Sequence, residues 1–125
     1  IESDGLSDRC ELVSGSFFES IPQGADAYFM RHIIHDWDEA KCHTILGHCH
    51  RAMKADSKLL IVESVIPEGN EPFGGKFLDL VMLLITGGRE RTEAEYRELL
   101  EQTGFELTRV VPTESEVSVV EAVKR

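Results

Sequence analysis

The sequence has little positive charge and no long apolar run. Its 125 residues include 13 lysines and arginines against 23 acidic residues, which gives a formal net charge of −10. Repulsion therefore disfavours a broad nucleic-acid-binding face or an anionic membrane partner. The most apolar window covers residues 77–85 and contains Asp79, far short of the roughly 20 residues of a transmembrane helix. We expect neither a nucleic-acid partner nor a membrane-spanning segment.

Cysteine is also scarce, and several common motifs are missing. The three cysteines are an odd number with no secretory leader ahead of them, which favours free thiols in a reducing compartment. We therefore expect a cytoplasmic protein. The chain contains neither a Walker loop nor a G-x-G-x-x-G or G-x-S-x-G motif, so phosphate binding by a glycine-rich loop and serine hydrolysis lose support.

The segment CHTILGHCH, residues 42–50, concentrates thiols and imidazoles and invites a metal interpretation. On a helix, Cys42 and Cys49 fall on an apolar stripe, whereas His43 and His50 share a more polar face. Thiols and imidazoles therefore do not converge on one tetrahedral point. We interpret the cysteines as core residues and the histidines as surface residues, and we predict no metal site.

What is present is the pattern of a single globular α/β domain. Residues 10–15 and 25–34 are strand candidates, the second apolar enough to be covered on both faces. Residues 38–53 repeat apolar side chains at helical spacing, and residues 58–64 form another apolar strand. Strand, helix and strand make a βαβ unit, which predicts two parallel strands.

The second half of the chain predicts two helices and a strand pair. Residues 77–85 favour a buried helix, and Thr92 with Glu95 forms a capping box that opens a helix ending at Gly104. Residues 105–113 and 116–125 alternate with period two, as antiparallel strands do. We expect a mostly parallel sheet that closes with a C-terminal antiparallel strand pair.

Titratable residues follow both strands of the βαβ unit. His35 and Asp36 come after the first strand, and Glu63 ends the second. Parallel strands joined by one helical crossover end at the same edge, where α/β sheets bind ligands. We therefore predict that His35 and Glu63 lie side by side. Glu90 precedes the capped helix and is a third candidate, because its loop can fold back over that edge.

Each of these residues also has a structural interpretation. Asp36 or Asp38 can be a helix N-cap with no further role. His35 can be a hydrogen-bonded structural imidazole, and Glu90 a favourable charge near a helix N-terminus. Glu63 ends an apolar strand, where a carboxylate must be paired, so function and structure explain it equally well.

Three segments carry a resemblance to a known family: GSFFESIPQGADAYFMRHIIHDWDEAKCHTIL, LLIVESVIPEG and DLVMLLITGGRERTEAEYRELLEQTGF. From about Cys10 onward the chain resembles the carboxyl-terminal half of the catalytic domain of S-adenosylmethionine-dependent O-methyltransferases of the caffeic acid and hydroxyneurosporene type. HDWD and GGRERT at this separation are the most specific part of the match. The resemblance implies a Rossmann-like fold, S-adenosylmethionine as the cofactor, and a small, typically phenolic, hydroxylated substrate.

The resemblance also implies roles for individual residues. His35 matches the family's catalytic base, and Glu63 and Glu90 match the two acidic residues that flank it. Asp36 matches a position near the substrate. Three further residues fall at positions that contact the cofactor: Ser16, Phe17 and Arg31. Ser16 departs from the family, because most relatives have an aspartate there that accepts a hydrogen bond from the adenine amino group.

The resemblance implies that residues 1–125 are one partial methyltransferase domain. The family's glycine-rich turn, its acidic ribose-binding residue and its helical dimerisation domain all precede the matching region. We therefore carry two hypotheses. One is an O-methyltransferase that binds a small hydroxylated substrate and forms a homodimer. The other is a non-catalytic fragment that associates with itself or with a partner along an open sheet edge.

Overall fold

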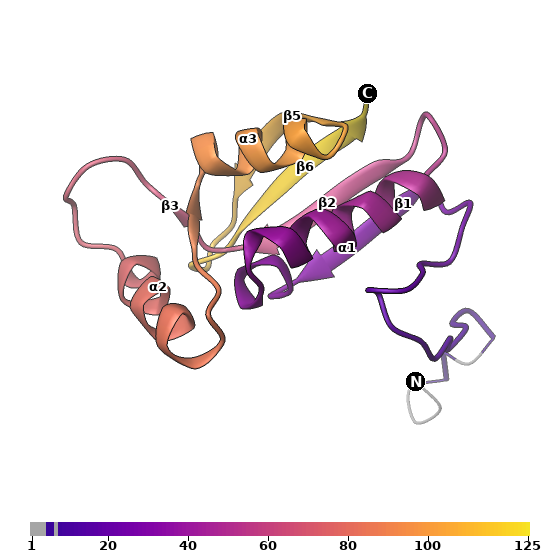
Figure 1. The fold of residues 1–125 in the computed structure, drawn as a ribbon, viewed down its shortest axis with the longest axis horizontal. Helices are drawn as coiled ribbons and strands as arrows, with labels where there is room; N and C mark the ends of the chain where they lie inside the picture. Colours follow the sequence, from indigo (N-terminus) through magenta and orange to yellow (C-terminus); the bar gives the residue numbers. More distant parts are fainter. Residues whose placement is uncertain (1–4, 7) are drawn as a thin grey trace.

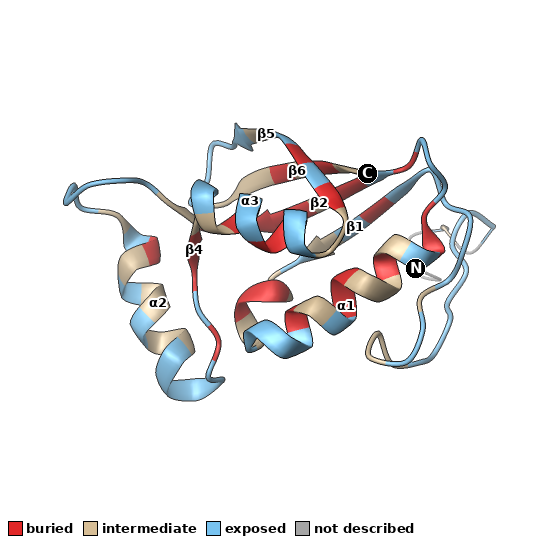
Figure 2. Cartoon of the chain, turned by 45° about the horizontal axis from the view of Figure 1, so that its top comes forward, coloured by how far each residue is buried: buried red, intermediate tan, exposed pale blue. Residues whose placement is uncertain are grey.

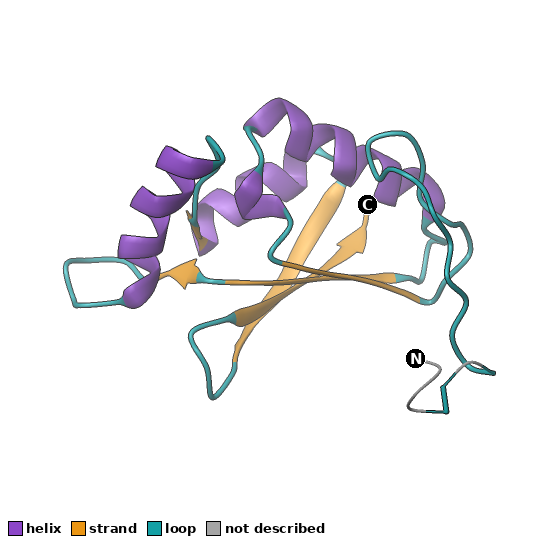
Figure 3. Ribbon diagram, turned by 90° about the horizontal axis from the view of Figure 1, so that it is seen from below, coloured by secondary structure: helices purple, strands orange, loops and turns teal. Residues whose placement is uncertain are grey.

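The computed structural model describes residues 5–6 and 8–125 as a mixed sheet with helices on one side (Figure 1). The main sheet has the strand order β1-β2-β6-β5, and a second, two-stranded sheet pairs β3 with β4. Seen along the sheet, helices α1 and α3 lie over the same face (Figure 3). The strands are β1 (Ala27–Arg31), β2 (Lys58–Glu63), β3 (Val65–Ile66), β4 (Arg91–Thr92), β5 (Phe105–Pro112) and β6 (Ser118–Lys124).

The predicted βαβ unit is confirmed. Strand β1 pairs with β2 in parallel, with Tyr28 opposite Leu59, and α1 (Glu39–Ala52) connects them. Asp38 is the N-cap of α1, because its carboxylate accepts a hydrogen bond of 2.9 Å from the amide of Lys41. This N-cap is one of the two that the sequence allowed.

The predicted C-terminal strand pair is confirmed, but it changes the character of the sheet. Strand β6 pairs antiparallel with β5 and also antiparallel with β2, where Leu59 lies opposite Ala122. The α/β class therefore holds, while the main sheet is mixed rather than mostly parallel. Helix α3 (Glu93–Gln102) precedes this pair and begins with the predicted capping box, in which both Thr92 and Glu95 make their reciprocal bonds.

Three expectations about local structure are wrong. Residues 10–15 form no strand; they are exposed, and no described strand pairs with them. Strand β1 is not covered on both faces, since Tyr28 is buried while Phe29 is 66% exposed. Helix α2 (Gly74–Ile85) exists but is not buried: Phe77 is 72% exposed and Leu84 is 84% exposed (Figure 2). An apolar pattern predicts an element, but the elements packed against it decide its burial.

The core lies between the main sheet and helices α1 and α3. The stripe of α1 predicted from sequence points into it, and both Cys42 and Cys49 are buried free thiols. Burial raises the pKa of each thiol to about 11, so both stay protonated and behave as small apolar side chains. The cytoplasmic location that free thiols suggested stays a prediction. Among the described residues, no helix is both long and apolar enough to cross a bilayer.

Candidate active site

His35 lies in a single 3₁₀ turn, Ile34–Asp36, directly after β1. The chain enters this turn through His32, which has a φ of 53°, in the left-handed region that few side chains adopt. The rings of His32 and His35 are stacked, with their centroids 5.0 Å apart. Backbone of this kind persists only where the surroundings support it, and the three amides that follow His32 all donate to Glu63.

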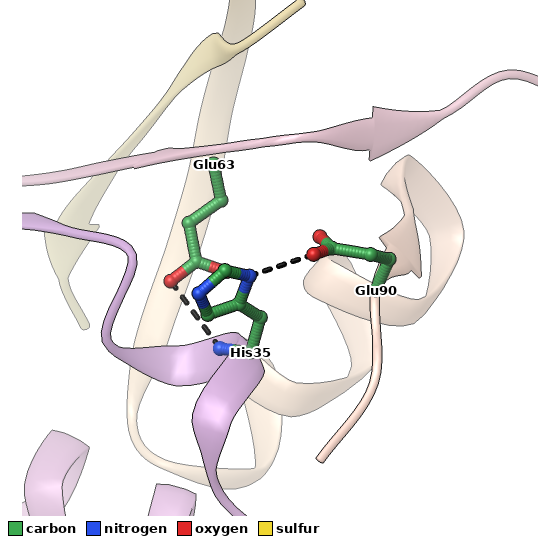
Figure 4. Close-up of side chains that lie close together, drawn as sticks. All are labelled: His35, Glu63 and Glu90. Carbon is green, nitrogen blue, oxygen red and sulfur yellow. Dashed lines mark hydrogen bonds and ion pairs between the residues drawn. The ribbon is translucent and has the colours of Figure 1, made fainter. Parts of the chain in front are cut away.

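Glu63 holds the backbone of the His35 turn. Its Oε1 accepts hydrogen bonds from the amides of Ile33 (3.0 Å), Ile34 (2.7 Å) and His35 (3.4 Å). Figure 4 shows the carboxylate directly beside the imidazole. The predicted proximity of His35 and Glu63 is thus confirmed. The hydrogen bonds of Glu63 to this turn go to its main chain.

Glu90 holds the ring itself. Its Oε1 lies 2.6 Å from Nδ1 of His35, in a fully buried contact (Figure 4). The backbone amide of Glu90 in turn donates a 2.8 Å hydrogen bond to Oδ1 of Asp79. The loop before α3 therefore does fold back over the edge of the sheet, as predicted, and it fixes one nitrogen of the imidazole.

The charges around His35 favour its protonated form. Burial is the largest single influence and by itself lowers the pKa of the imidazole. The hydrogen bond to Glu90 and the negative charges of Glu63, Glu90 and Asp36 outweigh it, so the pKa of His35 is raised above its ordinary value of 6.5. The imidazole is therefore a stronger base than one in water.

His35, Glu63 and Glu90 offer ligand atoms that all lie within 4.8 Å of one another. Several of these atoms already serve other partners, although Oε2 of Glu90 has no hydrogen-bond partner among the described residues. Nδ1 of His35 is bonded to Glu90, and both oxygens of Glu63 accept hydrogen bonds from the protein. A metal ion would have to displace those bonds, so the arrangement suits proton transfer better than metal binding.

Three further residues belong to this cluster that the sequence did not predict there. Arg91 is fully buried, and its guanidinium donates to the carbonyl of Ile34 and to Oε2 of Glu39. A Cβ on Gly88 would collide with the carbonyl oxygen of His35, so only glycine fits there. The hydroxyl of Tyr96 donates to Oε2 of Glu63 at 2.8 Å. A tyrosine on the apolar stripe of a helix was the available signal, since buried tyrosine hydroxyls need a partner.

The residues predicted to contact a cofactor line two neighbouring pockets. Phe17 and Arg31 line a mainly apolar pocket of about 320 Å³ beside β1, together with Met30 and Ile33. Ser16 lines a second pocket of about 500 Å³ that also includes Phe17. The hydroxyl of Ser16 accepts a bond from the amide of Phe18 within its own turn.

Asp36 lies at the mouth of the cluster. Its side chain is 38% exposed, and its Oδ1 is 3.6 Å from Nε2 of His35. Nε2 is therefore the nitrogen of the imidazole that faces away from Glu90. The predicted substrate contact of Asp36 stays a prediction, but its position next to the available nitrogen is consistent with it.

Comparison with known proteins identifies the family that the chain resembles in sequence. Residues 2–106 match the family model of the O-methyltransferase domain. The chain is 51% identical over 118 residues to the phenazine O-methyltransferase PhzM of Lysobacter antibioticus, covering 94% of this chain and 35% of that protein. It is 44% identical over 108 residues to the mitomycin biosynthesis 6-O-methyltransferase of Streptomyces lavendulae, covering 86% of this chain and 31% of that protein.

Solved structures match just as closely. The crystal structure of LaPhzM superposes with a TM-score of 0.95 at 48% identity, over 99% of this chain and 37% of the other. NcsB1, solved with S-adenosylmethionine and 2-hydroxy-5-methyl naphthoic acid, gives 0.88 at 36% identity, over 99% and 36%. The chain thus spans about a third of the length of these proteins. Because the family model covers most of its residues, the chain belongs to the O-methyltransferase domain family.

Proposed function

We propose that His35, held by Glu63 and Glu90, is the catalytic base of an enzyme that moves a methyl group from S-adenosylmethionine to a hydroxyl of a small, phenolic metabolite. The observation that carries the proposal is the buried pair of His35 and Glu90, with Nδ1 and Oε1 2.6 Å apart. The names of the relatives support it, since one is a phenazine O-methyltransferase and the other a mitomycin biosynthesis 6-O-methyltransferase. NcsB1, solved with a hydroxynaphthoic acid, supports an aromatic acceptor.

His35 acts as a general base in this proposal. Because Nδ1 donates its proton to Glu90, the lone pair of the neutral imidazole is on Nε2. A phenol with a pKa near 10 keeps its proton at neutral pH. Nε2 takes that proton while the phenol oxygen bonds to the methyl carbon, a contribution of typically 10²–10⁴-fold in rate. S-adenosylmethionine, when bound, supplies the methyl on a sulfonium sulfur, and the carbon–sulfur bond breaks with its electrons left on sulfur.

The pockets beside β1 fit part of such a cofactor. An apolar pocket lined by Phe17, Met30 and Ile33 suits an aromatic ring, and its volume of about 320 Å³ is that of a small-molecule site. Arg31, whose backbone ends β1, lies at the same pocket. Ser16 offers a hydroxyl where the family has a carboxylate, so it would make a neutral contact to the adenine amino group.

A second candidate function is association through exposed apolar surface. Phe29 lies on the outer strand β1 at 66% exposed, and α2 carries further exposed apolar side chains. Apolar patches of this kind on soluble proteins mark interaction sites, and an open strand edge offers backbone groups for pairing. This surface supports self-association, including the homodimer predicted from sequence.

One pair of measurements separates the two candidates. Calorimetric titration of the complete polypeptide that carries this chain is expected to show S-adenosylmethionine binding at about micromolar Kd, roughly −8 kcal/mol. Light scattering of the same sample reports its mass. Micromolar binding supports the enzyme. No measurable binding of S-adenosylmethionine together with a mass above that of one chain favours the association module. A mass of one chain at high concentration contradicts self-association.

Glu90→Gln is expected to lower the pKa of His35 and to slow methyl transfer. The substitution removes the charge of Glu90 but leaves the burial of the ring, which lowers the pKa. The rising limb of the pH–rate profile, which follows loss of the proton from His35, therefore moves to lower pH. An NMR titration of the His35 ring measures the same shift directly.

Glu90→Gln is also expected to lower the stability of the fold, and the size of this loss depends on pH. Because the pKa of His35 is raised in the folded protein, the pair stabilises the fold below the ordinary pKa, and this contribution is lost as pH rises through the folded value. Glu90→Gln should therefore destabilise the protein most at acidic pH. Glu93→Gln, at an exposed glutamate nearby that pairs with Arg97, is the matched control and should leave the His35 pKa unchanged. An unchanged pKa in Glu90→Gln would contradict the role of Glu90.

A further inference from the structure

Tyr96 belongs to the same hydrogen-bonded cluster as His35 without touching it. The side chain is fully buried, and its hydroxyl donates to Oε2 of Glu63 at 2.8 Å. The other oxygen of Glu63 accepts from the backbone amides of Ile33, Ile34 and His35. An unbroken path of hydrogen bonds therefore runs from the Tyr96 hydroxyl to the main chain of the candidate base.

The hydroxyl of Tyr96 keeps its proton and therefore remains a hydrogen-bond donor. Burial is the largest influence that raises the pKa of Tyr96, and the charge of Glu63 and the hydrogen bond to Glu63 raise it further. The pKa of Tyr96 therefore lies well above its ordinary value of 10.0. The phenol therefore keeps its proton at any pH at which His35 titrates. A phenylalanine would fill the same apolar space, so packing alone does not require this hydroxyl.

The same segment of chain contacts both the His35 ring and the Glu63 carboxylate that holds the turn. Glu90 precedes β4 and bonds the imidazole ring, and Tyr96 lies in α3 and bonds Glu63. The capping box of Thr92 and Glu95 fixes the start of α3 between them. The ring and the backbone of His35 are thus both anchored to one rigid unit. Anchoring of this kind lets an enzyme hold a base within a fraction of an ångström of its working position.

We propose that Tyr96 is a positioning residue for methyl transfer. Its hydroxyl fixes the Glu63 carboxylate, which holds the turn and thereby aims the imidazole of His35. The role in catalysis rests on the function proposed above. Without the hydroxyl, Oε2 of Glu63 has no donor among the described side chains, and a fully buried carboxylate with an unpaired oxygen turns to find another partner. That rotation weakens the amide bonds that hold the turn.

The test is Tyr96→Phe in the complete polypeptide that carries this chain, with two readouts. We expect kcat to fall about 3- to 30-fold while KM for S-adenosylmethionine stays within about twofold, because the base is misplaced and the cofactor contacts are not. We also expect hydrogen exchange at the amides of Ile34 and His35 to speed up at least about tenfold. Combined with Glu63→Gln, the substitution should cause little further loss of kcat.

Thr103→Val is the matched control. It removes a hydroxyl at the other end of the helix, where Thr103 donates to the carbonyl of Leu99, and it should leave kcat and both exchange rates unchanged. Wild-type kcat in Tyr96→Phe would overturn the proposal. If the wild-type protein transfers no methyl group, the proposed function fails, and exchange alone decides: faster exchange supports the positioning role of Tyr96, and unchanged exchange overturns it.

Discussion

Replacing His35 by alanine is expected to lower kcat for methyl transfer about 10²–10⁴-fold, the usual contribution of a general base. Nε2 is the only imidazole nitrogen of His35 not bonded to Glu90, and it is lost with the ring. The affinity for S-adenosylmethionine should change less than about twofold, since the pockets beside β1 do not depend on this ring. Steady-state kinetics and calorimetry on the complete polypeptide measure the two quantities.

Two controls make the His35→Ala result specific. His43→Ala removes another imidazole, one that lies on α1, and should leave kcat unchanged. Added imidazole should restore part of the lost activity in His35→Ala, because a free base can occupy the vacated space. Full activity in His35→Ala would remove His35 from the mechanism, and a loss of cofactor affinity equal to the loss of rate would assign it to binding.

Glu63→Ala is expected to have the largest effect on stability, about 3–5 kcal/mol of the free energy of unfolding. The substitution leaves three backbone amides and the hydroxyl of Tyr96 without their acceptor. Buried donors that lose their partner cost about 1–3 kcal/mol each, and relaxation or entering water recovers part of the sum. Denaturant unfolding followed by circular dichroism measures the change.

Glu63→Gln and Glu106→Ala complete that experiment. The side-chain amide that Glu63→Gln introduces keeps an oxygen that can accept from the backbone, so this substitution should cost about half as much or less. Glu106 is exposed and pairs loosely with Arg125 at 3.8 Å, so Glu106→Ala should stay within about 0.5 kcal/mol. A loss below about 1 kcal/mol in Glu63→Ala would contradict the view that this carboxylate holds the turn.

The order of elements was readable from sequence because their patterns are local. The apolar stripe that contains Cys42 and Cys49 predicted α1, and the spacing of Thr92 and Glu95 predicted the start of α3. Burial was not readable, because it depends on what lies opposite. Phe29 and Leu84 belong to strongly apolar segments, yet both are exposed, since no described element covers the outer face of β1 or the far side of α2.

The members of the candidate site were predictable, but their contacts were only partly so. The topology of a βαβ unit brings His35 and Glu63 to one edge, and the loop before α3 adds Glu90. That Glu63 bonds amides follows from the left-handed backbone of His32, which turns the following N–H groups toward the carboxylate. No pattern in the sequence predicts a left-handed backbone conformation at a histidine. The contact of Tyr96 was not predictable, because its hydroxyl bonds a residue 33 positions away in the sequence.

In the proposed reaction, Nε2 of His35 takes the proton of the acceptor hydroxyl. The most direct test is a crystal structure of the complete polypeptide with S-adenosylhomocysteine and a phenolic acceptor bound. We expect the acceptor oxygen within hydrogen-bond reach of Nε2, about 2.6–3.2 Å, with Nδ1 still bonded to Glu90. An acceptor whose hydroxyl contacts a different base, or an imidazole turned away from Glu90 in the complex, would contradict this role of Nε2.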